Sequence, residues 1–179
     1  TFYIAVGGSP SNTATGGYVS LKTIAAGAAG TWIPINVSGQ GTMFGVSALN
    51  DSTYVAVGGS QNIYKTTDSA ATWMKKDSGL ATSVLYDVHF PTNTVGYAVG
   101  GTPSAPTTGA VAKKTVDGGN TWTPLVLPIT NTLYGVHFTD ASTGYVVGNS
   151  GVVYKTTDGG LSWNQQFSTV STDLMKVVF

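Results

Sequence analysis

Residues 155–163 read Lys-Thr-Thr-Asp-Gly-Gly-Leu-Ser-Trp, and the chain carries further copies of this stretch. A close copy at 114–122 reads Lys-Thr-Val-Asp-Gly-Gly-Asn-Thr-Trp. A third copy, Lys-Thr-Thr-Asp-Ser-Ala-Ala-Thr-Trp at 65–73, has lost both glycines, and a fourth that ends at Trp32 is eroded. The tryptophans at 32, 73, 122 and 163 are separated by 41, 49 and 41 residues. Repetition at a spacing of this size indicates a repeat architecture.

The repeated stretch has the chemistry of a tight turn between two strands. Alternating residues lead into it, an Asp side chain can accept hydrogen bonds from the backbone of the turn, and glycine tolerates positive φ there. The Trp that follows has a large apolar face suited to a gap between packed sheets. We therefore interpret the motif residues as structural staples and not as catalytic groups: Asp68, Trp73, Asp117, Gly118, Gly119, Trp122, Asp158, Gly159, Gly160 and Trp163.

Two other elements recur at the same period. One is a Tyr-x-Val-Gly strand, seen at 97–100 and 145–148, and with one more residue between Tyr and Val at 54–58 and 3–7. The other precedes it and reads Leu-x-x-Val-x-Phe at 85–90 and 133–138, with divergent copies at 43–48 and 174–179. One period thus holds four short strands. Four strands repeating every 40 to 50 residues predict an all-β fold, a β-propeller of four-stranded antiparallel blades.

The order of the elements predicts how the propeller closes. The chain ends on a first strand and starts on a second strand, so 174–179 would complete the N-terminal blade. We expect one domain over 1–179, with repeats at approximately 174–179 plus 1–42, 43–84, 85–132 and 133–173, and most simply four blades. The alternative is a segment of a larger propeller.

Two long loops join the second strand of a repeat to the third, where the other repeats have a few residues. Insertions at such places often carry binding, although neutral drift explains them equally well. The candidate binding residues in these loops are Ser9, Pro10, Ser11, Asn12, Thr13, Thr102, Pro103, Ser104, Pro106 and Thr107.

Composition excludes several functions. Only 9% of residues are charged, against about 25% in typical soluble proteins. All eight basic residues are Lys and all eight acidic residues are Asp, so Arg and Glu are absent, and the net charge is zero. This balance argues against nucleic acid as a partner. A sialidase mechanism needs an Arg cluster and a Glu, and without cysteine there is no thiolate chemistry. We expect no cofactor and no enzymatic activity.

Two repeated side chains could face a central channel. His89 and His137 occupy the same place in adjacent repeats and could bind a metal together, but two ligands make a poor site, so we expect structural histidines and no metal. Phe44, Tyr86, Tyr134 and Met175 share another strand position. We expect them to pack between blades; if they are exposed, they suit sugar stacking.

These motifs resemble the BNR or Asp-box repeat, and more closely the propeller family of the photosystem II stability and assembly factor. Residues 133–163 match that family's pattern in full and 85–122 nearly so. The resemblance implies the propeller fold. Similar repeats occur in sialidases, sortilin-type receptors and large secreted bacterial surface proteins, so the resemblance does not name a function. Members of the assembly-factor branch use an Arg-bearing face for their partner, and this chain has no Arg.

The main functional hypothesis is a non-catalytic, secreted or cell-surface module for binding, adhesion or structure, within a larger protein or assembly. Abundant Gly, Thr, Ser and Asn with few charges suit an extracellular bacterial protein. The alternatives are an assembly or chaperone-like factor for a membrane protein complex and a glycan-binding lectin. The expected partner is a protein or a glycan, with no membrane insertion.

Overall fold

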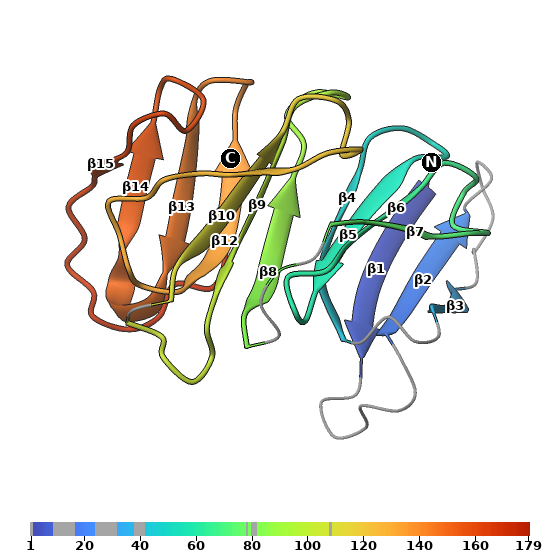
Figure 1. Ribbon diagram of the computed structural model, residues 1–179, viewed down its shortest axis with the longest axis horizontal. Helices are drawn as coiled ribbons and strands as arrows, with labels where there is room; N and C mark the ends of the chain where they lie inside the picture. Colours follow the sequence, from blue (N-terminus) through green and yellow to red (C-terminus); the bar gives the residue numbers. More distant parts are fainter. Residues whose placement is uncertain are drawn as a thin grey trace.

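The computed structural model describes residues 2–8, 17–23, 32–37, 42–77, 79, 82–107 and 109–179. Its strands form four antiparallel sheets that stand side by side, each in chain order (Figure 1). Blade A contains β1 (Phe2–Gly8), β2 (Gly17–Thr23) and β3 (Trp32–Val37). Blade B contains β4 (Met43–Ala48), β5 (Tyr54–Gly58), β6 (Ile63–Thr66) and β7 (Met74–Asp77).

Blade C contains β8 (Val84–His89), β9 (Gly96–Gly101), β10 (Val111–Thr115) and β11 (Thr123–Pro124). Blade D contains β12 (Leu133–Phe138), β13 (Gly144–Gly148), β14 (Val153–Thr156) and β15 (Asn164–Gln165), with the short 3₁₀ turn η1 (Asn149–Gly151). The predicted all-β fold of four-stranded propeller blades is confirmed. No helix in the described part of the chain has the length and apolar character needed to cross a membrane.

The Leu-x-x-Val-x-Phe strands β4, β8 and β12 are the inner strands of blades B, C and D, and each lies beside the next. All three carry a β-bulge at the second place of the Leu-x-x-Val-x-Phe element. Met43 pairs with Gly58 and Gly45 with Val57, so Phe44 is the extra residue. Tyr86 and Tyr134 are the extra residues of β8 and β12. A bulge interrupts the alternation of faces and redirects a side chain, which explains why the apolar spacing is first three residues and then two.

The glycine that ends each Tyr-x-Val-Gly strand has a steric cause. A Cβ atom on Gly58, Gly100 or Gly148 would collide with a backbone carbonyl at the start of the inner strand of the same blade, that of Thr42, Val84 or Thr132. No other residue fits this crossing without moving the backbone. The recurrent Gly therefore fixes how closely the first and second strands of a blade approach.

The hydrophobic core lies between blades. One cluster joins Val55, Val57 and Ile63 of blade B to Leu85 and Val88 of blade C. A second cluster joins blades C and D, where the rings of Tyr97 and Phe138 stack with centroids 3.5 Å apart. Blades B, C and D thus bury apolar side chains against one another, as sheet packing requires.

The predicted ring closure is wrong. Blade A has three strands, ordered β1-β2-β3, and 174–179 is not among them. This segment lies instead against blade D: the Leu174 N–H donates to the Gly148 carbonyl of β13 at 3.0 Å, and the Phe179 ring contacts His137 of β12 at 5.6 Å. The segment lies beside β12 in the same way that β12 lies beside β8, because each inner strand packs on the blade before it. The four sheets form an open row (Figure 1), which agrees with the alternative, a segment of a larger propeller.

Candidate functional site

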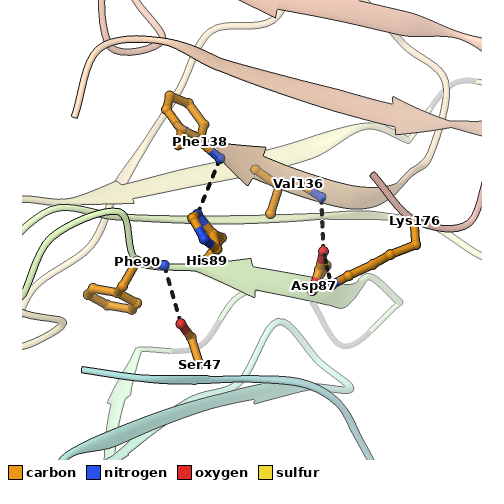
Figure 2. Close-up of polar contacts among 7 residues, drawn as sticks. All are labelled: Ser47, Asp87, His89, Phe90, Val136, Phe138 and Lys176. Atoms are coloured by element: carbon orange, nitrogen blue, oxygen red, sulfur yellow. Dashed lines mark hydrogen bonds and ion pairs between the residues drawn. The ribbon is translucent and has the colours of Figure 1, made fainter. Parts of the chain in front are cut away.

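Side chains bridge the inner strands of neighbouring blades (Figure 2). An inner strand pairs with the second strand of its blade along one edge only. The backbone N–H groups of its other edge have no partner in the same sheet and need an acceptor when buried. Ser47 Oγ of β4 accepts from the Phe90 N–H at 3.3 Å. His89 Nδ1 of β8 accepts from the Phe138 N–H at 3.2 Å. These bonds connect blade B to blade C and blade C to blade D.

Asp87 makes the most extensive of these bridges. Its carboxylate is buried and accepts from the Val136 N–H at 2.9 Å. It also forms an ion pair with Lys176, whose Nζ lies 2.7 and 2.8 Å from the two oxygens. Gly135 leaves room for this crossing, since a Cβ there would come 2.9 Å from the Lys176 Cα. Asp87 therefore joins β8, β12 and the segment 174–179.

Sequence reasoning did not find the Asp87–Lys176 pair. Both residues occupy the third place of the Leu-x-x-Val-x-Phe element, where the other two copies have Gly45 and Gly135. Charged residues at a position that otherwise requires glycine are the signal that could have found the pair.

The two histidines do come together. Their rings stack with centroids 4.2 Å apart and an interplanar angle of 28°. Burial, followed by the nearby His137 and Lys176, lowers the pKa of His89 to about 4. A neutral His89 with a free Nδ1 lone pair is the form that can accept from Phe138. Within the described residues no cluster of three or more His, Cys, Asp or Glu side chains could hold a metal.

The bulged aromatic residues form a ladder, not the packing between blades that we expected. The rings of Phe44 and Tyr86 meet at 5.4 Å and 60°, and those of Tyr86 and Tyr134 at 5.1 Å and 68°. Phe44 is 45% exposed and Met175, at the end of the ladder, 62%. The bulge explains the difference, because it redirects these side chains away from the core. They line a pocket of about 250 Å³ together with Asp87 and Lys176.

The Asp turns have the predicted geometry. Asp117 accepts from the Thr121 N–H at 2.9 Å and the Thr121 hydroxyl at 2.7 Å, and the Thr115 hydroxyl donates to it at 2.8 Å. Asp68 and Asp158 are held in the same way. Hydrogen bonds, above all from the hydroxyl four residues on, lower the pKa of Asp68 and Asp158 to about 2 and that of Asp117 below its usual range.

The other staple residues complete the turn. Gly118, Gly119, Gly159 and Gly160 all have positive φ, from 69° to 87°. Trp122 and Trp163 meet Phe90 and Phe138 edge to face at 5.9 and 6.1 Å. The third copy, which ends at Trp73, keeps the backbone shape without glycine, because Ser69 and Ala70 have φ of 57° and 68°.

Lysines also connect the blades on the side of the Asp turns. Lys65 Nζ donates to Asn120 Oδ1 at 3.1 Å, and Lys114 Nζ donates to the Gly159 carbonyl at 2.8 Å. Lys113 forms an ion pair with Asp77 at 2.8 Å. Three of the eight lysines thus make contacts between blades, and one of them, Lys113, has its charge balanced by a carboxylate.

The loop with Thr102, Pro103, Ser104, Pro106 and Thr107 lies beside the connections between blades. The Pro106 carbonyl accepts from the Thr132 N–H at 2.6 Å, just before β12, and Thr102 Oγ1 lies 3.2 Å from Ser83 Oγ. Pro103, Ser104 and Thr107 are exposed. Its binding role remains a prediction. The other candidate loop, with Ser9, Pro10, Ser11, Asn12 and Thr13, lies outside the described residues.

Blades of this form, with an Asp turn before a Trp, define a β-propeller of the BNR type. Residues 114–179 match the family model described as photosynthesis system II assembly factor YCF48. The resemblance inferred from the sequence is thus confirmed for the C-terminal part of the chain. None of the curated proteins matches the sequence.

Solved structures share the fold. A structure of YCF48 bound to D1 peptide is 20% identical with a TM-score of 0.58, over 69% of this chain and 39% of that one. YCF48 from Cyanidioschyzon merolae is 18% identical with a TM-score of 0.56, over the same shares. An ancestral GH74 enzyme is 16% identical with a TM-score of 0.66, over 92% of this chain and 24% of the enzyme. The chain spans less than two fifths of each of these proteins.

Proposed function

We propose that this chain is part of a non-catalytic propeller that binds a segment of a membrane-complex subunit during assembly. The observation that carries the proposal is the match of residues 114–179 to the YCF48 family model, which extends from β10 through blade D to the segment 174–179. A solved YCF48 structure holds a D1 peptide, which supports a protein segment as the partner. These 179 residues contain no Arg, so they do not supply the Arg side chains of the partner face that the family resemblance implies.

The acidic residues favour binding over catalysis. A glycosidase of the two-carboxylate kind needs two acids that face one substrate. Seven of the eight Asp carboxylates accept hydrogen bonds or form ion pairs within the fold: Asp68, Asp77, Asp87, Asp117, Asp140, Asp158 and Asp173. The structural neighbours include GH74 enzymes, so a hydrolysis assay on a panel of polysaccharides is the direct check. Turnover above that of the urea-unfolded chain would contradict a non-catalytic role.

The binding test uses overlapping synthetic peptides of D1, labelled with fluorescein and titrated with the chain. We expect saturable binding of at least one peptide and none of its scrambled version. If no D1 peptide binds, and the chain also fails to co-sediment with solubilised photosystem II, the assembly-factor role is wrong.

The secreted or adhesion role rests on composition, since abundant Gly and few charges are its support. The comparisons give it no support, and the same holds for a glycan partner. Extracellular localisation remains a prediction. Cell fractionation with an antibody to the chain tests it, and a membrane-associated pool would favour the assembly role.

A further inference from the structure

We propose that the aromatic pocket, defined by Phe44, Tyr86, Tyr134, Met175 and the Asp87–Lys176 pair, binds an apolar side chain of an extended peptide. This inference rests on the proposed function for the kind of partner, a protein segment. The bulges, the aromatic ladder and the ion pair define the pocket independently of that function.

The bulges place the aromatic residues in the pocket. The same bulge recurs in three successive blades, each time with an aromatic residue as the extra one. Regular alternation with Leu and Val would not leave such a side chain half exposed. Bulges are frequent next to binding sites because they redirect a side chain, and grouped, partly exposed aromatic residues are typical of ligand pockets.

The ion pair supplies one polar contact. An ammonium group has three donors, and the two contacts of Lys176 among the described residues go to one carboxylate. The Lys176 side chain is 58% exposed and lines the pocket, so it can donate to a ligand acceptor. Asp87 balances its charge. The matching acceptor is therefore a neutral carbonyl beside an apolar group, which is the chemistry of a peptide backbone with an apolar side chain.

The ring geometry favours a peptide over a glycan. At interplanar angles of 60° and 68°, the edge of one ring meets the face of the next. Sugars stack on open aromatic faces, and here neighbouring rings cover those faces in part. Apolar side chains need no flat platform, and a pocket of about 250 Å³ has room for one large one.

The test probe is an acetylated and amidated heptapeptide, Ser-Leu-Ser-Leu-Ser-Leu-Ser, with an all-Ser/Gly heptapeptide as the control. Titration of the ¹⁵N-labelled chain should shift the amide signals of residues 44, 86 and 134, and only with the Leu peptide. Phe44→Ser should weaken binding about tenfold or more, as for a central aromatic contact. Lys176→Met should weaken it about tenfold by removing the charged donor.

Phe167→Ser is the matched control, because Phe167 is 95% exposed and lies outside this pocket. Its binding should equal that of the unmodified chain. Unchanged binding in Phe44→Ser, or no binding of the Leu peptide, would overturn the pocket proposal. If cello-oligosaccharides shift the same signals and the Leu peptide does not, the ligand is a glycan and the peptide proposal is wrong.

The two proposals can fail separately. A D1 peptide that binds Phe44→Ser and the unmodified chain equally well leaves the assembly role intact and removes the pocket from it. Pocket-dependent binding of the Leu peptide without binding of any D1 peptide leaves the pocket intact and removes the assembly role.

Discussion

Replacing Ser69 by glycine should stabilise the protein, although it removes a side chain. Ser69 is exposed and has φ of 57°, where the other two described Asp turns have glycine. The left-handed conformation costs a residue with a Cβ atom about 1 to 2 kcal/mol. Glycine loses about 0.5 to 1 kcal/mol through its greater freedom in the unfolded chain. The net gain is about 0.5 to 1 kcal/mol, which raises the melting temperature by about 1 to 4 °C for a chain of this size.

The neighbouring position supplies a contrast. Ala70 has φ of 68° but is fully buried, so Ala70→Gly also loses a methyl group worth about 0.8 kcal/mol. We expect it to leave the melting temperature nearly unchanged. Gly119→Ala should destabilise by about 2 to 4 kcal/mol, because its Cβ would lie 3.1 Å from Val55 Cγ2 at φ of 82°.

Differential scanning calorimetry measures all three variants, with Thr67→Gly as the control. Thr67 is exposed in the same turn and is not among the residues with positive φ, so glycine there should lower the melting temperature. The reasoning is refuted if Ser69→Gly lowers the melting temperature as much as Thr67→Gly does.

The other predictions concern the bridges and the turns. Asp87→Ala should cost about 2 to 4 kcal/mol in urea unfolding, because the buried Val136 N–H loses its acceptor and the ion pair is lost; an effect below 1 kcal/mol would contradict the bridging role. His89 has a folded pKa of about 4, below the unfolded value of about 6.5, so the unfolded chain binds the proton first and stability falls as pH drops from about 6.5 to 4; His89→Asn keeps an acceptor and should flatten that fall in the melting temperature. Asp158, with a folded pKa of about 2 against about 3.9 unfolded, contributes stability that is lost as pH falls from about 4 to 2, and Asp158→Asn should reduce the loss over that range. Trp122→Ala should cost about 3 to 5 kcal/mol through a cavity, but Trp122→Phe clearly less in the same urea assay, since the indole N–H has no partner among the described residues.

The repeated motifs determine most of the fold. Leu, Val and Phe at the first, fourth and sixth places of the inner strand are buried in β12, and the second and fifth are partly exposed. The sequence shows this spacing, but a strand read as strictly alternating predicts no bulge, and without the bulge the aromatic residues are expected between blades. A one-residue insertion in strand pairing leaves little other trace in a single sequence.

The position of 174–179 could not be predicted for a different reason. Its pattern identifies an inner strand, and inner strands have two neighbours: the sheet that they start and the blade before it. The sequence favoured the first neighbour, whereas the contacts of Leu174 and Phe179 are with blade D. The Asp87–Lys176 pair depends on that placement, since the two residues are 89 positions apart and meet only when the segment lies against β12.

The junction of blades B and C and that of blades C and D are bridged by different side chains. Ser47 serves the junction of blades B and C, whereas Asp87 and His89 serve that of blades C and D. Gly45 must face Asp87 and Gly135 must face Lys176, because a Cβ atom on either glycine would come 2.9 Å from the Cα atom of that residue. A blade moved to another place would meet the wrong side chain. Although the blades arose from one pattern, they are not interchangeable parts. Shuffling or duplicating a blade in protein engineering would therefore require transplanting the bridging side chain of the blade before it as well.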